Sequence, residues 1–567
     1  MTEHKNDPHE ALRAARDLLV DARTDSARAA AEFSWPDVGE RFNWAIDWFD
    51  RIARGNERTA LRIAEEDGRE AAYSFDELAT RSDRTARWLE SRGIGRGDAV
   101  LLMLDNQVEL WEAMLAVMKL GAVLVPTTTA LGAADLGDRL IRSDARAVIA
   151  NPADTGKFAA VDGDFLRVAI GAVDGWTDYA EARGHADATP FETVTAPDDP
   201  LLMYFTSGTT QAPKLVQHTQ YSYPVGHLST LYFLGLRPGD VHLNVSSPGW
   251  AKHAWSSFFS PWLAEATIFV HNRARFSPEA LLEQIERVGV TTLCAPPTAW
   301  RMLVQHPLAG RATSLREIVG AGEPLNPEVI THVQREWGLT IRDGYGQTET
   351  TAQVGNAPGA EVRFGSMGKP LPGVPVVLID PATGAEAEEG EICLDLSRNP
   401  RNLMSGYRAD AERTAAVMAD VLYHTGDIAS RDGEGYLTYV GRTDDVFKSS
   451  GYKISPFELE SALIEHAAVA EAAVVPAPDA TRHTVPKAYV ALASGWEPDE
   501  RTALAVLTHA RDALAPYLRV RRVEFAELPK TISGKIRRAE LRAREEAGTG
   551  ADGEWRYEDF PELKSGA

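Results

Sequence analysis

One stretch of the chain, residues 204–214, has the side chains that a phosphate group needs. It carries four hydroxyls, one glycine and one lysine: Thr206, Ser207, Gly208, Thr209, Thr210 and Lys214. Hydroxyls and bare backbone N–H groups on a tight loop suit phosphate oxygens, and the lysine adds a positive charge. The usual phosphate loop also has a second glycine before the lysine and Ser or Thr after it, and both are missing here. By itself, such a loop is more often a solvated turn.

Four further stretches have the composition of turns that hold a nucleotide. Residues 320–325 follow an apolar pair and predict a strand end that turns tightly, without the third glycine of a dinucleotide fingerprint. Residues 342–349 place two glycines around a tyrosine, followed by threonine and glutamate. Residues 423–427 end in Gly-Asp, and residues 530–535 end in Ser-Gly-Lys. Each stretch alone is most simply a turn or a solvated charge, so only their joint occurrence carries weight.

The segments around these stretches predict how they are positioned. Strand-like and helix-like pieces alternate from about residue 60 to 190 and again after the phosphate-type loop. This rhythm predicts parallel sheets with helices on both faces. Residues 374–379 and 390–394 are more β-like and predict a smaller β subdomain, and a compact α+β unit follows residue 445. The expected strands include 99–104, 122–126, 147–150, 201–203, 241–245 and 266–270, and the expected helices include 9–32, 42–49, 108–120, 255–262, 278–288 and 456–466.

Bulk composition excludes several classes of protein. The 567 residues are too many for one core, and 44% hydrophobic with 25% charged residues are ordinary globular values. The net charge of −23 disfavours a nucleic-acid partner and an anionic membrane surface. Cys294 and Cys393, each flanked by apolar residues, predict buried reduced thiols rather than a disulfide framework or a zinc cluster. Without a signal sequence or an apolar run long enough to span a membrane, the chain is expected to be cytoplasmic.

In this order, the five stretches resemble the adenylate-forming superfamily of acyl-CoA synthetases, peptide-synthetase adenylation domains and luciferases. The resemblance covers nearly the whole chain, from roughly residue 40 to 540. It implies an α/β fold with a large N-terminal adenylation domain over 1–443, made of two α/β subdomains and a small β subdomain. A small, mobile α+β lid over 444–545 would carry the catalytic lysine. The Gly-rich, acidic stretch 546–567 is expected to be a mobile tail, although its aromatic residues leave docking open.

The resemblance implies an ATP site. The hydroxyl loop and Lys214 would bind the phosphates. The adenine pocket would be formed by two stretches, with Tyr345 stacked on the base: Gly322, Glu323 and Pro324, then Asp343, Gly344, Tyr345 and Gly346. Asp427 would bind both ribose hydroxyls, assisted by Arg442.

The resemblance also implies the groups that act in the reaction. Thr348 would touch the α-phosphate, and Glu349 would hold Mg²⁺ as a hard oxygen ligand. Lys535 would bridge the substrate carboxylate and the α-phosphate while negative charge builds up, which is electrostatic catalysis. In this superfamily the substrate forms no covalent bond to an enzyme nucleophile. The absence of a Gly-x-Ser-x-Gly elbow agrees with this.

A second half-reaction requires a different site around the same AMP. In the superfamily the lid rotates on a hinge, which by position is Asp444 here. The loop 449–453 then enters, with Gly451 leaving room for the pantetheine arm of CoA; a plain turn glycine stays open as an alternative. The residues expected to bind CoA are Ser450, Gly451, Tyr452 and Lys453. Bringing a thiol to the bound acyl-adenylate is then mostly positioning.

The chain also departs from the superfamily pattern. Gln211 and Leu215 stand where glycine is usual or frequent, which puts loop mobility in doubt. Lys453 replaces a common arginine, and the two are not equivalent at a bidentate site.

Residues 42–49 and 248–252 resemble the medium-chain acyl-CoA synthetase branch. Trp250, His253 and Tyr221 are expected to line the acyl pocket, with ordinary core packing as the alternative. A pocket of this kind suits a medium-chain, branched or aromatic acid and discriminates modestly between chain lengths. The main hypothesis is an AMP-forming acyl-CoA synthetase that uses ATP, Mg²⁺ and CoA.

Two alternatives stay open. The enzyme could load the phosphopantetheine of a carrier protein, although no fused carrier domain follows residue 540. The second alternative is a non-catalytic adenylate-binding protein. The presence of both Lys535 and Glu349 argues against it. The oligomeric state, including a homo-oligomer, stays open.

Overall fold

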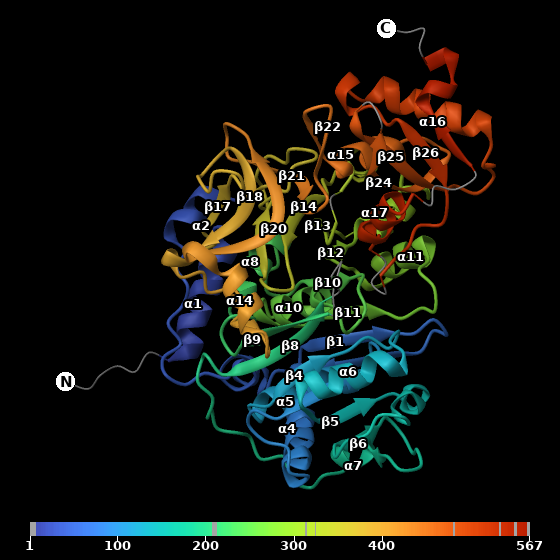
Figure 1. The fold of residues 1–567 in the computed structure, drawn as a ribbon. Helices are drawn as coiled ribbons and strands as arrows, with labels where there is room; N and C mark the ends of the chain where they lie inside the picture. The colour runs from blue at the N-terminus through green and yellow to red at the C-terminus, as the bar shows by residue number, and fades with distance from the viewer. Residues whose placement is uncertain are drawn as a thin grey trace.

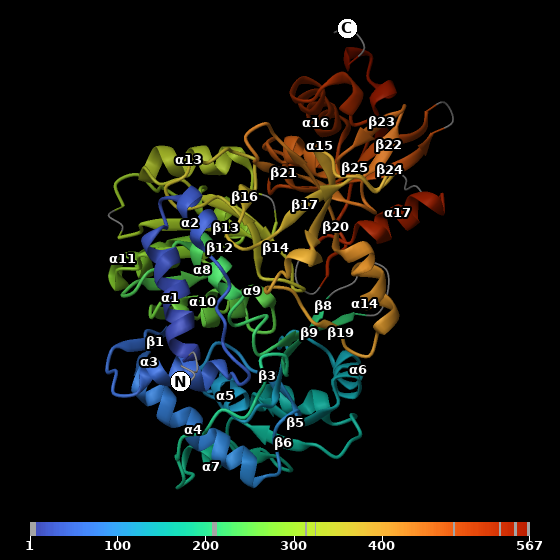
Figure 2. The same ribbon diagram turned by 90° about the vertical axis from the view of Figure 1, so that its left-hand side faces the viewer.

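Two mixed β-sheets form the centre of the N-terminal domain (Figure 1, Figure 2). The computed structural model describes residues 7–206, 213–311, 314–323, 325–479, 482–531, 535–548 and 553–563. One sheet has nine strands in the order β16-β15-β14-β13-β12-β10-β11-β1-β2, and the other has eight in the order β19-β9-β8-β4-β3-β5-β6-β7.

The strands of the nine-stranded sheet are β1 (Thr59–Ala64), β2 (Glu70–Ser74), β10 (Val241–Asn244), β11 (Thr267–His271), β12 (Thr292–Ala295), β13 (Glu317–Ala321), β14 (Arg342–Gly346), β15 (Ala352–Gly355) and β16 (Lys369–Pro370). Those of the eight-stranded sheet are β3 (Ala99–Met103), β4 (Val123–Pro126), β5 (Ala145–Ala150), β6 (Leu166–Ala169), β7 (Thr177–Asp178), β8 (Pro200–Thr206), β9 (Lys214–Thr219) and β19 (Gly406–Tyr407). Inner neighbours pair in parallel, which confirms the expected α/β class. Pairs such as β1–β2, β8–β9 and β14–β15 are antiparallel, because their short connections cannot make a crossover.

Helices cover both faces of each sheet. In the eight-stranded sheet, Leu101 and Met103 pack with Leu136 of α6, whereas Val100 and Leu102 pack in the cluster that holds α4 and α5. Helix α5 is buried along its whole length, as an all-round apolar helix must be. The helices of the N-terminal domain are α1 (Pro8–Asp21), α2 (Ser26–Glu32), α3 (Arg51–Ala53), α4 (Phe75–Ser91), α5 (Val108–Lys119), α6 (Ala133–Ser143), α7 (Ala180–Arg183), α8 (His227–Leu234), α9 (Ala251–Ala254), α10 (Ser260–Leu263), α11 (Pro278–Val288), α12 (Pro297–Leu303), α13 (Pro327–Trp337) and α14 (Ala411–Val417).

Two expected helices take a different form. The aromatic stretch around residues 42–49 is a π-helical turn, η1 (Trp44–Asp50), and the stretch after Trp250 contains a second one, η3 (Trp255–Phe259). Both lie in the main core, where aromatic rings pack against one another, for example Phe49 on Trp262 at 4.6 Å between ring centroids. Burial of large rings therefore outweighs regular helix geometry here.

A small β subdomain lies between the sheets and the C-terminal domain (Figure 1). Its strands are β17 (Val376–Ile379), β18 (Glu389–Asp395), β20 (Leu422–Arg431) and β21 (Leu437–Arg442), in the order β17-β18-β20-β21. All neighbours in this sheet are antiparallel. The β-like composition of 374–394 is thereby explained.

The C-terminal domain is a compact α+β unit, drawn in orange and red (Figure 1). Its elements are β22 (Phe447–Ser449), β23 (Tyr452–Ile454), α15 (Pro456–Ile464), β24 (Val469–Asp479), β25 (His483–Leu492), α16 (Glu500–Ala513), β26 (Arg522–Phe525), α17 (Arg538–Glu546) and β27 (Glu554–Arg556). Strand β27 pairs with β26, and Tyr557, Phe560 and Leu563 are buried in the domain core. The described part of the tail is thus docked, which differs from the mobile tail expected over 546–567.

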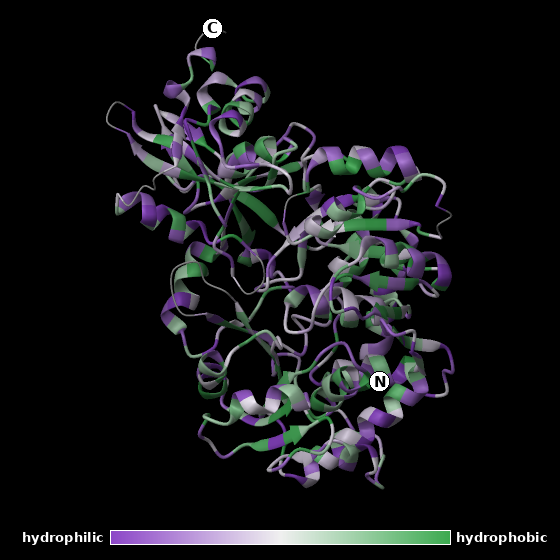
Figure 3. Ribbon diagram, turned by 90° about the vertical axis from the view of Figure 1, so that its right-hand side faces the viewer, coloured by the Kyte–Doolittle hydropathy of each residue, from purple (hydrophilic) through white to green (hydrophobic). Residues whose placement is uncertain are grey.

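Hydropathy follows this architecture. The hydrophobic colour is concentrated along the inner strands, and the outer helices alternate between hydrophobic and hydrophilic residues (Figure 3). Within the ranges that the structure describes, no helix has both the length and the apolar character needed to cross a membrane.

Candidate active site

The predicted phosphate loop joins two neighbouring antiparallel strands. Thr206 ends β8 and Lys214 begins β9, and the two residues are register partners. Both ends of the loop are therefore fixed by backbone pairing. Four predicted ligands in the loop, Ser207, Gly208, Thr209 and Thr210, lie outside the described residues, as do Gln211 and Pro324.

Lys214 meets the predicted metal ligand Glu349 through a tyrosine. The Lys214 Nζ donates to the Tyr407 hydroxyl at 3.2 Å, and that hydroxyl donates to Glu349 Oε1 at 3.0 Å. The lysine lies 4.0 Å from the same carboxylate oxygen. Burial lowers the pKa of Lys214, and the negative charge of Glu349 opposes that shift. Tyr407 was not predicted, since no pattern along the chain links β19 to these two residues.

A buried histidine holds the backbone of Thr348. The ring of His218 lies 2.8 Å from the Thr348 carbonyl oxygen through Nε2, and 3.1 Å from Ser222 Oγ through Nδ1. Because a carbonyl only accepts, Nε2 carries the proton. Burial lowers the pKa of His218 to about 4, so the ring is neutral at pH 7. The histidine therefore fixes the segment that carries both Thr348 and Glu349.

Four side chains from two separate strands and a loop converge on Asp427. Its Oδ2 accepts hydrogen bonds from the Tyr345 hydroxyl and from Gln347 Nε2, each at 2.6 Å. Its Oδ1 accepts one from the Tyr439 hydroxyl at 3.2 Å and lies 3.4 Å from Arg442 Nη1. The structure therefore brings the predicted ribose ligand next to the predicted adenine-binding tyrosine.

The carboxylates near Arg442 favour its charged form. Burial alone would lower the pKa of Arg442, but the carboxylates of Asp427 and Asp444 raise it overall. Of the partners of Asp427, Gln347 lies inside a stretch that the sequence singled out, whereas nothing in the sequence indicated Tyr439.

Three of the predicted adenine-pocket residues, Asp343, Gly344 and Gly346, lie on β14, which pairs with the end of β13. The Asp343 carboxylate accepts from the backbone N–H of Leu325 at 3.2 Å and of Gly344 at 2.9 Å, and burial raises its pKa to about 7. A Cβ on Gly344 would lie 2.6 Å from the ring of Phe233, and one on Gly346 would lie 2.4 Å from the ring of Trp255. Close packing against these rings therefore requires glycine at both positions. Contact of Gly344, Gly346, Gly322 and Glu323 with adenine stays a prediction.

The three residues expected in the acyl pocket contact different elements. His253 Nε2 lies 2.8 Å from Asn106 Oδ1, and its ring lies 5.7 Å from Trp111. The Tyr221 hydroxyl donates to the Pro36 carbonyl at 2.7 Å, and Arg401 lies over its ring. Trp250 is half-buried and precedes α9. A pocket shared by all three stays a prediction.

The predicted catalytic lysine and the predicted hinge residue lie at the surface. Lys535 is exposed, and among the described residues no hydrogen bond or ion pair joins its ammonium group to Thr348, Glu349 or any other side chain. Its backbone N–H donates to Thr531 Oγ1 at 3.1 Å. Asp444, the expected hinge, lies 3.5 Å from Arg442 Nε and 3.7 Å from an Arg542 nitrogen.

The expected CoA loop is the tight turn of the β22–β23 hairpin. Ser450 and Gly451 both have positive φ, +50° and +87°, and a Cβ on Gly451 would meet no atom within 4 Å. Lys453 Nζ lies 2.6 Å from Glu389 Oε1 of the β subdomain, and the ring of Tyr452 stacks on Tyr517. The glycine is thus a turn residue with open space beside it.

Comparison with known proteins agrees with the order of these motifs. A family model described as AMP-binding enzyme matches residues 48–408, and one described as AMP-binding enzyme C-terminal domain matches 458–535. The chain is 43% identical over 520 residues to 4-hydroxybutyrate--CoA ligase 1 of Metallosphaera sedula, covering 89% of this chain and 91% of that protein. It is 38% identical over 531 residues to the mitochondrial acyl-coenzyme A synthetase ACSM3 of Mus musculus, covering 90% and 91%.

Solved structures show the same fold. An acyl-CoA synthetase of Brucella canis matches with a TM-score of 0.69 and 34% identity, over 94% of this chain and 99% of that one. The anthranilate CoA ligase AuaEII, in complex with anthranoyl-AMP, matches with a TM-score of 0.81 and 27% identity, over 92% and 99%. These findings confirm the family predicted from the sequence: the chain belongs to the AMP-binding enzymes, as an AMP-forming acyl-CoA synthetase of the adenylate-forming superfamily.

Proposed function

We propose that this synthetase activates a medium-chain, branched or aromatic acid with Mg²⁺-ATP and passes the acyl group to free CoA. In the first half-reaction, a carboxylate oxygen attacks the α-phosphorus of ATP, acyl-AMP forms and pyrophosphate leaves. In the second, the CoA thiol attacks the acyl carbon, the thioester forms and AMP leaves. The observation that carries the proposal is the convergence of Tyr345, Gln347, Tyr439 and Arg442 on Asp427, in a chain of this family.

The residues around Glu349 fit a magnesium ion. Its Oε1 is held by Tyr407, whereas in the described part of the chain no donor reaches Oε2. A carboxylate oxygen without a donor, on a side chain that is 12% exposed, is the hard ligand that Mg²⁺ takes. When bound, the ion would neutralise charge on the ATP phosphates. Lys214 would lie beside the same phosphates, and His218 would hold Thr348 toward the α-phosphate through the backbone.

The first half-reaction needs Lys535 at the phosphate, and the exposed position of this lysine therefore calls for a lid rotation. The proposed hinge is Asp444, next to Arg442. An ammonium group that arrives only when the lid closes stabilises the charge that develops during attack and excludes water from the acyl-adenylate. The loop of Ser450, Gly451, Tyr452 and Lys453 would bind CoA in the other lid position.

The substrate class rests on Trp250 and His253, with Tyr221 as a further proposed lining residue. Burial lowers the pKa of His253 to about 3, so its ring is neutral and adds no charge to the pocket. Names of relatives point to acids of different length and polarity, including 4-hydroxybutyrate and, for solved structures, benzoate and anthranilate. The panel of acids to be tested should therefore include short hydroxy acids.

The test is ATP–pyrophosphate exchange driven by each acid of such a panel, repeated with CoA and followed by mass measurement of the thioester. Exchange together with acyl-CoA is the expected result. Exchange without acyl-CoA would favour a carrier-protein acceptor, and no exchange with any acid would contradict the proposal. A homo-oligomer and a cytoplasmic location both stay predictions.

A further inference from the structure

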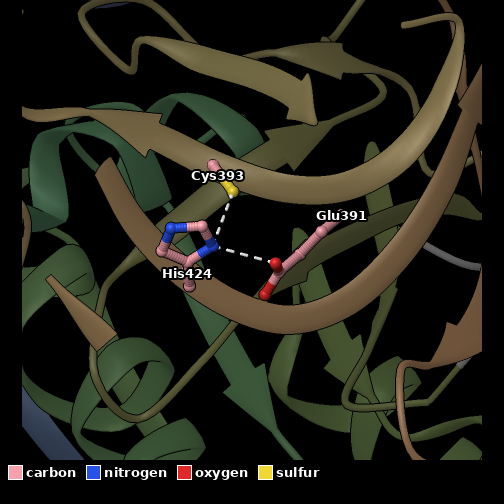
Figure 4. A group of neighbouring side chains, drawn as sticks. All are labelled: Glu391, Cys393 and His424. Carbon is pink, nitrogen blue, oxygen red and sulfur yellow. Dashed lines mark hydrogen bonds and ion pairs between the residues drawn. The ribbon is translucent and has the colours of Figure 1, made fainter. Parts of the chain in front are cut away.

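Three side chains that can ligate a metal ion meet on the β subdomain (Figure 4). Glu391 and Cys393 lie two residues apart on β18 and therefore point to the same side of the strand. His424 of β20 is the register partner of Cys393. The three residues come from neighbouring strands, and the register of these strands shifts between Glu391 and Cys393.

The donor atoms lie near the spacing of zinc ligands. His424 Nδ1 lies 2.9 Å from Glu391 Oε2 and 3.5 Å from Cys393 Sγ, and all three donor atoms lie within 4.8 Å of one another. Zinc bonds of about 2.0–2.3 Å in a tetrahedral arrangement put neighbouring donors roughly 3.3–3.8 Å apart. Shifts of well under about 1 Å would bring all three atoms to such bond lengths.

The second carboxylate oxygen of Glu391 is already held. Its Oε1 accepts from the Gly426 backbone N–H at 2.7 Å, so Oε2 faces the histidine and the thiol. Such an outer hydrogen bond is what orients a ligand in known metal sites. The His424 and Glu391 side chains are 26% and 13% exposed, which gives an ion and one water a way in.

A bound ion would hold Cys393 as a thiolate and His424 through Nδ1, because the deprotonated sulfur is the form that ligates zinc.

We propose that Glu391, Cys393 and His424 form a Zn²⁺ site, with water as the fourth ligand. It would bind one ion by a thiolate, a carboxylate and a neutral imidazole. The ion would fasten β18 to β20 three residues before Asp427, apart from the Mg²⁺ proposed at Glu349. This proposal departs from the sequence prediction of no zinc cluster, because a glutamate and a histidine supply the other two protein ligands beside Cys393.

The test uses Co²⁺ as a coloured substitute for Zn²⁺, added to the full-length protein in excess Mg²⁺, which occupies oxygen-only sites. One equivalent of Co²⁺ should produce a near-ultraviolet thiolate-to-metal absorption, and Zn²⁺ should abolish it. Cys393→Ser and His424→Gln should each lose the absorption. Cys294→Ser is the matched control, because Cys294 is the other of the two cysteines and is buried in β12.

A wild-type protein without the thiolate absorption would overturn the proposal, even if it binds Co²⁺ elsewhere. So would an absorption that survives Cys393→Ser or disappears in Cys294→Ser. ATP–pyrophosphate exchange by each variant verifies folding separately. If Cys393→Ser does not fold, His424→Gln decides, because a retained absorption there would also contradict the site.

Discussion

At the scale of single residues, Lys535 is the group whose position most restricts the mechanism. It is exposed on the lid, whereas Thr348 and Glu349 lie in the N-terminal domain. A residue that acts only after a domain movement should affect one half-reaction and not the other.

Lys535→Ala should slow acyl-adenylate formation by about 10²–10³-fold, the usual effect of removing one group that stabilises the transition state. Thioester formation from preformed acyl-AMP should be largely retained. Lys530→Ala is the matched control, because Lys530 lies in the same segment but pairs with Glu471 at 2.6 Å. Single-turnover assays of each step measure this, and equal loss of both steps would refute the two-position lid.

The Tyr407 hydroxyl lies between Lys214 and Glu349 and is hydrogen-bonded to both. Tyr407→Phe removes a hydrogen bond to a charged group, worth about 1.5–3 kcal/mol, and should raise the half-saturating Mg²⁺ concentration roughly tenfold or more. Tyr436→Phe is the control, since its hydroxyl donates to the Glu361 carbonyl. A Mg²⁺ titration of exchange activity compares them, and an unchanged Mg²⁺ requirement would remove Tyr407 from the site.

Asp427 is surrounded by donors that a ribose would partly replace. Asp427→Asn removes the charge with little change of shape and should weaken ATP binding by at least about tenfold, or ~1.4 kcal/mol. The exposed Asp432, paired with Arg363, provides the control substitution Asp432→Asn. Equilibrium binding of a non-hydrolysable ATP analogue measures the effect; equal affinity of both variants would mean that the ribose site is elsewhere.

At the scale of elements, close backbone contact joins the two sheets beside the proposed acyl pocket. Gly249 has φ of +88°, and a Cβ there would lie 2.3 Å from the Thr128 backbone nitrogen. The glycine therefore sets how closely the segment of Trp250 approaches the end of β4.

Gly249→Ala should lower the melting temperature and raise KM for the acid, because the backbone of residues 127 and 128 must move. Gly239→Ala separates the two causes, since Gly239 has φ of +85° but no atom within 4 Å of an added Cβ. It should cost only the strain of positive φ, roughly 1–2 kcal/mol, and leave KM unchanged. Equal effects of the two substitutions on melting and KM would show that close packing at Gly249 is unimportant.

At the scale of the whole molecule, a buried lysine pairs with carboxylates of three elements in the C-terminal domain. Lys487 is fully buried, and its Nζ lies 2.8 Å from Glu524, 2.7 Å from Glu545 and 2.9 Å from Glu554. These carboxylates belong to β26, α17 and the docked tail strand β27. A single cation thus joins the sheet, the last helix and the tail.

Lys487→Met should destabilise the lid by about 3–5 kcal/mol, because it leaves buried carboxylates without a counter-charge. Lys448→Met, at an exposed position of β22, should change stability by less than about 0.5 kcal/mol. Limited proteolysis of the tail and thermal melting measure both. A tail equally resistant in the two variants would show that Lys487 does not hold it.

The ion pair of Lys487 with Glu554 makes the docking of the tail depend on pH. Burial alone would raise the pKa of Glu554, but the hydrogen bond and charge of Lys487 lower it overall. A lowered carboxyl pKa stabilises the fold above the ordinary value of about 4.3 and ceases to do so as the pH falls through the folded-state pKa. Tail docking should therefore weaken only in acid.

The sequence by itself determined the family, the α/β class and the elements whose signals are local. Helix α11 (Pro278–Val288) has the predicted bounds because Ser277 caps it, proline occupies its first turn and Gly289 ends it with positive φ. The inner strands were predictable because burial on both faces makes them continuously apolar.

Only the tertiary structure decided which side chains meet. Tyr345 and Asp427 are 82 residues apart, and Lys214 and Tyr407 are 193 apart, so no local pattern relates them. The docking of the tail likewise involves residues far along the chain, since Glu554 pairs with Lys487, and Tyr557, Phe560 and Leu563 lie in the core of the C-terminal domain. Local propensity and spacing follow from neighbours along the chain, whereas such contacts follow from the packing of whole sheets.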